Sequence, residues 1–170
     1  MQNLRKVSIW TGVALLLISA TAAVGGEQPS GKTISPDLTL VERGRYLVKI
    51  AGCNDCHTPG YAESGGKVPE NEWLTGDRLG WRGPWGTTYP SNLRLYMQNL
   101  SESQWITVAG STQFRPPMPW FALRDMTEED RRAIYHFVKH LGPAGEPAPA
   151  YLPPDQEPKG PYVLFPQPPQ

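Results

Sequence analysis

The stretch Cys53-Asn54-Asp55-Cys56-His57 decides how this 170-residue sequence is interpreted. It has the form C-x-x-C-H, which is the attachment signature for c-type haem. Two thiols three positions apart lie on one helical turn, so each can bond a vinyl group of the same porphyrin. The imidazole that follows can then bind the iron. Because the string occurs once, the sequence predicts one haem c, bound covalently to Cys53 and Cys56, with His57 as an axial ligand of the iron.

Other interpretations of the two cysteines leave more unexplained. A thioredoxin-like redox pair expects a βαβ context, which the surrounding pattern lacks. A structural zinc site needs four ligands, and no second pair of cysteines exists; the remaining histidines are His136 and His140. A disulfide between Cys53 and Cys56 would leave His57 without a role. These alternatives stay open beside the haem hypothesis.

Met118 is the predicted second axial ligand of the iron. It lies in the segment Arg-Pro-Pro-Met-Pro-Trp at residues 115–120. The prolines exclude helix and fix the backbone, so an extended loop can hold a thioether against the iron at low entropic cost. Met97 lies in an apolar stretch and is expected in the core, and Met126 is expected to pack beside the last helix. The alternative is a proline-rich surface loop with a buried methionine.

Hydrophobic periodicity predicts helices and no alternating strand, which indicates an all-α fold. The first helix covers about residues 40–52. It contains Gly44, which costs about 1 kcal/mol relative to alanine unless it allows another backbone or ring to approach closely. A second helix begins after Ser101, which forms a capping box with Gln104, and it ends near Gly110.

The last predicted helix carries the clearest signals for its ends. Thr127 is its N-cap and Asp130 occupies the capping-box position. Gly142 followed by Pro143 is a strong stop signal. Residues 58–100 contain many glycines and are predicted to be mostly loop. Such a long irregular region fits a domain whose core is filled by something other than regular secondary structure.

Composition excludes several classes of function. The 16 Lys and Arg residues balance 16 Asp and Glu residues, which argues against the broad basic face that nucleic-acid binding needs. Two cysteines are too few for a disulfide-dense scaffold, and no P-loop, GxGxxG or HExxH string occurs. The length fits one domain. No nucleic acid and no small-molecule substrate is expected.

The chain is predicted to divide into four regions. Residues 1–23 combine a positive start, an apolar run and closing small residues, which predicts a signal peptide or, if uncleaved, an anchor in the inner membrane. Residues 24–37 are interpreted as a flexible lead-in and residues 38–142 as the domain. Residues 143–170 form a proline-rich tail, and its apolar side chains predict partial docking. The N-terminal segment predicts that the protein is exported to the periplasm, where it would be either free or tethered to the inner membrane.

Together these motifs resemble those of the monohaem class I c-type cytochromes. The resemblance covers about residues 40–142 and rests on Glu-Arg-Gly-Arg-Tyr-Leu at 42–47, on residues 52–58, on Met118 followed by proline, and on the capped last helix. The first segment is also similar to haem domains in the cytochrome c subunits of membrane-bound alcohol and gluconate dehydrogenases. This chain departs from those subunits in having one haem string rather than three, and residues 86–93 match their Asn-containing loop only loosely.

The resemblance implies a cytochrome c-like fold, in which three or more helices and long loops surround one covalent haem. It implies that the first and last helices cross, with Tyr135 or Phe137 against Gly44. It also implies that His57 hydrogen-bonds a backbone carbonyl near Pro59. Candidates to line the haem or to pair with its propionates are Trp81, Arg82, Trp85, Tyr89, Arg94, Trp105, Trp120 and Phe121.

An iron ligated by histidine and methionine has no open coordination position, which favours electron transfer over oxygen binding or substrate oxidation. The sequence therefore predicts an electron carrier and not an enzyme. It would pass single electrons between a dehydrogenase and a respiratory acceptor, either freely or as the cytochrome subunit of an oxidoreductase complex. The alternatives are a haem sensor or catalyst with a labile sixth ligand, and an exported binding protein with a Cys53–Cys56 disulfide.

Overall fold

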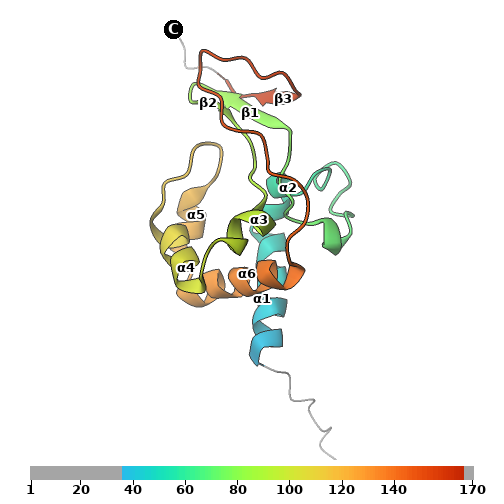
Figure 1. The fold of residues 1–170 in the computed structure, drawn as a ribbon, viewed down its shortest axis with the longest axis vertical. Helices are drawn as coiled ribbons and strands as arrows, with labels where there is room; N and C mark the ends of the chain where they lie inside the picture. The colour runs from blue at the N-terminus through green and yellow to red at the C-terminus, as the bar shows by residue number, and fades with distance from the viewer. Residues whose placement is uncertain (1–35, 167–170) are drawn as a thin grey trace, which may run out of the picture. The chain divides into compact units, whose positions relative to one another are not determined.

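The computed structural model describes residues 36–166, with side chains from residue 39 onward. The predicted signal peptide at 1–23 and nearly all of the lead-in at 24–37 lie outside the described residues. Within the described range the chain forms helices and three short strands (Figure 1). In chain order they are α1 (Pro36–Ile50), α2 (Cys53–His57), the 3-10 helix η1 (Glu70–Glu72), β1 (Gly80–Gly83), β2 (Gly86–Thr88), α3 (Leu93–Gln98), α4 (Glu102–Ser111), α5 (Trp120–Asp125), α6 (Glu128–Leu141) and β3 (Tyr162–Leu164).

Helices α1 and α6 cross at the end of the fold away from the sheet and make the most extensive contact between elements (Figure 1). The approach is close because Gly44 has no side chain. A Cβ atom at Gly44 would overlap the backbone carbonyl of Ala133 and lie 2.7 Å from Cβ of Phe137. Both Ala133 and Phe137 are fully buried. The prediction that a ring-bearing residue packs against Gly44 is therefore confirmed for Phe137.

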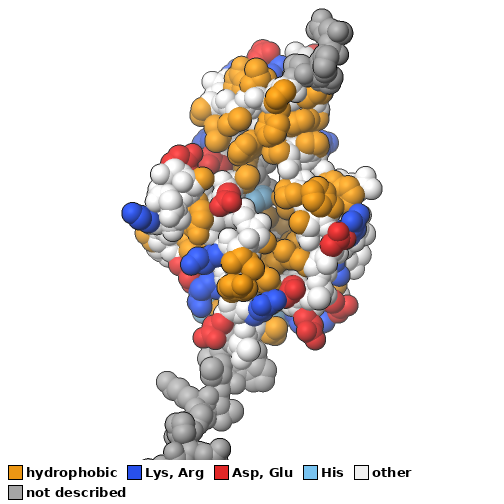
Figure 2. Space-filling view, turned by 180° about the vertical axis from the view of Figure 1, so that it is seen from behind, with side chains coloured by type: hydrophobic (Ala, Val, Ile, Leu, Met, Phe, Trp, Pro, Cys, Tyr) orange, Lys and Arg blue, Asp and Glu red, His pale blue; other side chains and the backbone are white. Residues whose placement is uncertain are grey.

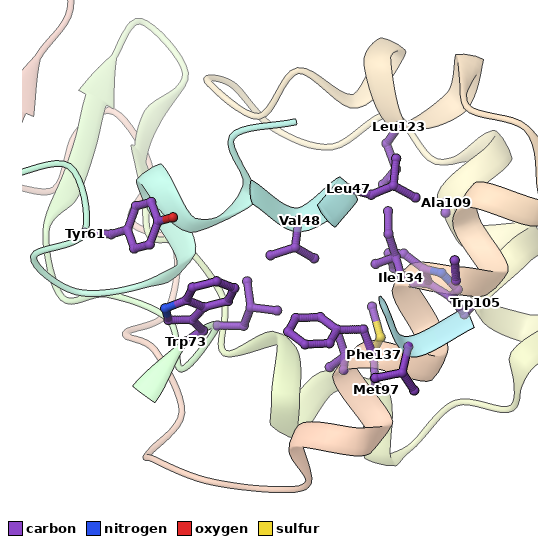
Figure 3. Close-up of a cluster of buried hydrophobic side chains, with 14 residues drawn as sticks. Leu47, Val48, Tyr61, Trp73, Met97, Trp105, Ala109, Leu123, Ile134 and Phe137 are labelled. Atoms are coloured by element: carbon purple, nitrogen blue, oxygen red, sulfur yellow. The ribbon is translucent and has the colours of Figure 1, made fainter. Parts of the chain in front are cut away.

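The hydrophobic core surrounds this crossing (Figure 3). Val48 of α1 and Met97 of α3 are fully buried there, and the Trp105 ring enters from α4. The ring of Trp73 meets that of Phe137 edge to face, with centroids 6.2 Å apart. Met97 is thus a core residue, as the sequence predicts. The protein assembles much of its core from its own side chains.

The predicted starts of α4 and α6 and the predicted stop of α6 are confirmed, whereas the first helix was predicted at about 40–52 and covers Pro36–Ile50. Ser101 and Gln104 form a reciprocal capping box at the start of α4. The Thr127 side chain accepts a hydrogen bond from the backbone N–H of Asp130, and α6 stops at Gly142, whose φ is 69°. Helices α3 and α5 were not predicted, because six residues span less than two turns and give little periodic signal. No helix within residues 36–166 is both long and apolar enough to cross a membrane.

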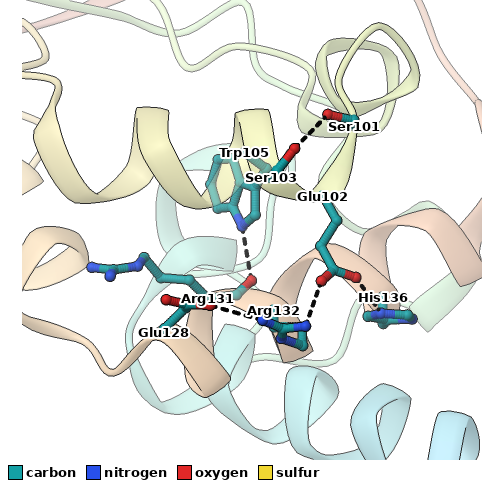
Figure 4. A network of polar contacts seen from close by, with 8 residues as sticks. All are labelled: Ser101, Glu102, Ser103, Trp105, Glu128, Arg131, Arg132 and His136. Atoms are coloured by element: carbon teal, nitrogen blue, oxygen red, sulfur yellow. Dashed lines mark hydrogen bonds and ion pairs between the residues drawn. The ribbon is translucent and has the colours of Figure 1, made fainter.

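Polar contacts fix α4 against α6 (Figure 4). The Glu102 carboxylate accepts from Arg132 at 2.7 Å and lies 2.9 Å from Nε2 of His136. The indole N–H of Trp105 donates to the backbone carbonyl of Arg131 at 2.8 Å. Trp105, one of the aromatic residues proposed to line a haem, is therefore engaged in joining these two helices.

The prediction of an all-α fold is wrong for two segments, which form a small sheet in the order β2-β1-β3. Strands β1 and β2 make an antiparallel hairpin, and β3 joins β1 in parallel. These strands contain only three or four residues, too few for an alternating pattern to be recognised. In addition, β3 belongs to the tail, so the residues next to it in the sequence give no indication that it pairs with β1.

The proline-rich tail runs from the end of α6 to this sheet (Figure 1). Leu152 exchanges two backbone hydrogen bonds with Thr87, at 2.7 and 3.0 Å. The ring of Phe165 packs against those of Trp81 and Trp85, with centroids 5.9 and 5.2 Å away. Phe165 thus docks the tail on the sheet through its side chain, in line with the predicted partial docking, whereas the side chains of β3 are exposed.

Candidate functional site

The C-x-x-C-H string forms its own short helix, α2, directly after α1. Gly52 makes the bend between the two helices with a φ of 70°, in the left-handed region that glycine adopts without strain. Cys53, Cys56 and His57 therefore share one short helical segment, and both cysteines are free thiols. The structure brings together these three of the four predicted ligand residues.

His57 is held in one orientation by the backbone around it. Its Nδ1 atom donates to the carbonyl oxygen of Ser91 at 2.8 Å, and its own carbonyl accepts from the N–H of Gly76 at 2.8 Å. Burial lowers the pKa of the imidazole, and the bond to Ser91 offsets this only in part. The neutral tautomer with hydrogen on Nδ1 leaves the lone pair of Nε2 for a metal.

The acceptor for His57 is a backbone carbonyl, as expected, but it lies in a different loop. It was expected near Pro59, whereas it belongs to Ser91 in the segment before α3. Gly76, with a φ of 80°, makes this possible, because a Cβ atom there would lie 2.7 Å from the backbone nitrogen of Asn92. The sequence does not reveal Ser91 as the acceptor, because every residue has a backbone carbonyl and the type of side chain does not show which carbonyl lies beside His57.

The two thiols are protonated near neutral pH in the chain by itself. Burial, with smaller contributions from the Asp55 carboxylate and the Cys56 thiol, raises the pKa of Cys53 to about 11. Burial also raises the pKa of Cys56, again with a contribution from Asp55. Partly buried, protonated thiols react more slowly with oxidants and alkylating agents than exposed thiolates do.

Met118 lies in the loop between α4 and α5, partly buried and packed against the hydrophobic core. Its N–H donates to the carbonyl of Arg115 at 3.2 Å, and its carbonyl accepts from the N–H of Trp120 at 2.8 Å. Helix α5 starts at once, with Pro119 as its N-cap. The loop is thus fixed on both sides of Met118, and its ligation of iron stays a prediction.

Some residues proposed to contact the haem have other partners. Phe121 is 53% exposed. Arg94 is buried and donates to three backbone carbonyls, among them that of Asn71 at 2.6 Å and two at the end of α6. Arg82 bonds to the tail through both of its terminal nitrogens. These arginines hold loops and helix ends in place.

The residues present fit a covalently attached haem. Two free thiols beside a neutral imidazole, with Nδ1 already engaged, are the donor set that haem c requires. Among the described residues no hydrogen-bond partner is seen for Nε2 of His57. Figure 2 shows a hollow below the sheet, with hydrophobic side chains around it and a histidine in its depth. An apolar recess with a metal-binding nitrogen suits a macrocycle that carries iron.

Comparisons with known proteins point in the same direction. A family model described as cytochrome c matches residues 41–142. The cytochrome c subunits of quinone alcohol dehydrogenases from Gluconacetobacter polyoxogenes and Komagataeibacter europaeus are each 28% identical over 161 residues, covering 86% of this chain and 30% of the relative. The chain thus spans about 30% of the length of these curated relatives. No solved structure gives a significant match.

Proposed function

The chain belongs to the cytochrome c family, and on this premise we propose that it carries single electrons through one covalently bound haem c. The family resemblance predicted from the sequence is thereby confirmed. The observation that carries the proposal is the geometry of α2. Two free thiols and the imidazole of His57 share this short helix, and the bond from Nδ1 to Ser91 leaves Nε2 as the nitrogen that would bind a metal.

Each of these residues has a defined role in the proposal. Cys53 and Cys56 would hold the haem through thioether bonds, and Nε2 of His57 and the sulfur of Met118 would be the axial ligands. When bound, haem c supplies an iron that gains or loses one electron. The Ser91 carbonyl makes the His57 imidazole a stronger donor by accepting its Nδ1 hydrogen. The thioether of Met118 would raise the reduction potential, since it favours reduced iron.

We infer the partners from the relatives, each of which is a cytochrome c subunit of an alcohol dehydrogenase. The chain would accept electrons from a dehydrogenase and pass them to a respiratory acceptor, as a free carrier or as one subunit of an oxidoreductase complex. We place it in the periplasm, with residues 1–23 acting as a signal peptide or as a tether to the inner membrane. Its partners would be proteins, met through small transient contacts.

Absorbance spectra test this proposal directly. The protein is produced in a periplasm that contains the haem-attachment system and is measured oxidised, reduced, and reduced under carbon monoxide. We expect a low-spin c-type spectrum that carbon monoxide leaves unchanged. Met118→Ala is expected to turn high-spin and to bind carbon monoxide. Met126→Ala, the same change at a partly buried methionine beside α6, is the matched control and should behave as wild type.

The same preparation separates the alternatives. Mass spectrometry should show one haem bound covalently, and its loss when both Cys53 and Cys56 are changed to serine. A wild-type protein that binds carbon monoxide readily would favour the sensor or catalyst with a labile sixth ligand. A colourless protein would contradict the haem proposal and favour the exported binding protein.

A further inference from the structure

Asn92 joins the tail to the loop behind His57. Its side chain is buried, with the residue 4% exposed. The Nδ2 atom donates to the carbonyls of Ala144 at 2.8 Å and Glu146 at 3.2 Å, at the start of the tail. The Oδ1 atom accepts from the N–H of Leu95 at 3.0 Å, in the first turn of α3. Because both amide atoms are bonded inside the protein, the side chain is locked in one orientation.

Anchoring Asn92 fixes the hydrogen-bond acceptor of His57. The Ser91 carbonyl and the Asn92 N–H belong to the same planar peptide unit, so the position of Asn92 sets the direction of that carbonyl. The Ser91 residue itself is exposed and reaches His57 only through its backbone, at 2.8 Å from Nδ1. The tail therefore acts on the imidazole through two covalently linked residues.

A second contact joins the tail to the loop that contains Met118. The Arg115 guanidinium lies 4.1 Å from the centroid of the Tyr151 ring, a close cation–π contact. The Tyr151 hydroxyl donates to the carbonyl of Trp85 at 2.7 Å, which ties the ring to the sheet. The Arg115 carbonyl in turn accepts from the N–H of Met118. The tail thus braces the residue that holds the backbone of Met118.

From these contacts we propose that the tail segment 144–151 positions both axial ligands of the haem iron. Asn92 is the positioning residue for His57, and Arg115 is the positioning residue for Met118. This inference rests on the proposed function, because it concerns the ligands of a bound haem. It gives the proline-rich tail a role in setting the strength of the two iron–ligand bonds, in addition to covering the sheet.

The first test replaces Asn92 with aspartate. Asn92→Asp keeps the oxygen that caps α3 but removes the two N–H bonds to the tail. In holoprotein with ¹⁵N-labelled histidine, we expect the Nδ1 proton of His57 to exchange with solvent about tenfold faster, which corresponds to about 1.4 kcal/mol. Asn99→Asp is the matched control, since Asn99 is exposed at the other end of α3.

A second variant perturbs the same contact from the tail. Gly145 has a φ of 73°, and a Cβ atom there would lie 3.2 Å from Nδ2 of Asn92. Gly145→Ala should therefore displace the tail from Asn92 and accelerate exchange of the His57 proton in the same direction. Gly65→Ala is its control, because Gly65 has a similar φ of 63° but open space around the added atom. This pair keeps the test valid if Asn92→Asp does not fold.

The Met118 side is tested by the rate at which cyanide binds the oxidised protein, because cyanide would have to replace the Met118 sulfur. Arg115→Gln removes the cation that faces Tyr151, and we expect binding about threefold faster, which corresponds to about 0.7 kcal/mol. Arg124→Gln is the control. It makes the same charge change in the adjacent helix α5, where the guanidinium faces the Trp120 ring instead of the tail.

The outcomes distinguish this inference from the proposed function. Faster exchange in Asn92→Asp and Gly145→Ala, faster cyanide binding in Arg115→Gln, and unchanged controls support it. Wild-type exchange and binding rates in all variants would overturn it while leaving the proposed function intact. Failure of the proposed function would appear in the wild-type protein itself, as a missing haem or as ready binding of carbon monoxide.

Discussion

The α1–α6 crossing and the docking of the tail on the sheet are held by different interactions. The crossing buries apolar side chains and brings two backbones together at Gly44. The tail is held at the surface, where Arg82 donates to the carbonyls of Pro154 and Gln156, and its strand β3 is exposed along its length. Buried apolar contacts set the global stability, whereas exposed hydrogen bonds permit local opening. The tail should therefore open without unfolding the helices.

The largest expected effect is at the crossing. Gly44→Ala would place a methyl group where the Ala133 carbonyl and Cβ of Phe137 already lie. Helices α1 and α6 would have to separate, and we expect a loss of about 3 kcal/mol in the free energy of unfolding. Denaturant unfolding of the holoprotein, followed by far-UV circular dichroism, measures this loss.

Gly110→Ala is the matched control for that substitution. Gly110 is also in a helix, but a Cβ atom there meets only the end of the Arg131 side chain, at 3.3 Å. That side chain can move, so the gain in helix propensity of up to about 1 kcal/mol should dominate. Equal destabilisation by both substitutions would show that the close approach at Gly44 is not what holds the crossing together.

Features that depend on neighbouring residues in the sequence were predicted well. The ends of α4 and α6 follow from signals within four residues, such as Ser101 with Gln104 and Thr127 with Asp130. The C-x-x-C-H string is recognised by its spacing alone, and its two cysteines and histidine all lie on α2. Gly44 also gave a usable signal, because a glycine in the interior of a predicted helix implies a close neighbour. These features are encoded locally and were predictable.

The features that were not predictable depend on distant partners. Strand β3 exists because Trp81 of β1 pairs with Val163, more than eighty residues away. The carbonyl of Ser91 is placed beside His57 by Gly76 and by the tail, and neither leaves a pattern next to Ser91 in the sequence. The sheet and the environment of His57 therefore required a structure, whereas recognition of the C-x-x-C-H string did not.

The next effect should be confined to the tail. Phe165→Ala removes the ring that packs on Trp81 and Trp85, and we expect a local loss of about 1.5 kcal/mol because the ring is partly buried. Hydrogen exchange of the β3 amides should accelerate about tenfold, while exchange in α6 stays unchanged. Leu164→Ala, at a side chain in the same strand that is 62% exposed, should change neither. Accelerated exchange in α6 would show that tail and core unfold together.

The smallest effect separates two kinds of contact made by one side chain. Arg82 has 14% of its side chain exposed and donates to two tail carbonyls, whereas its ion-pair partner Glu157 is 73% exposed. Arg82→Met should release the tail at a cost of about 1 kcal/mol, since it removes the carbonyl bonds as well as the ion pair. Glu157→Gln removes the charge alone and should cost at most about 0.3 kcal/mol.

The rate of protease cleavage of the tail, compared between the two variants at low and high salt, measures both effects. If Glu157→Gln released the tail as fully as Arg82→Met, the ion pair and not the carbonyl bonds would hold it, and the docking would weaken with salt.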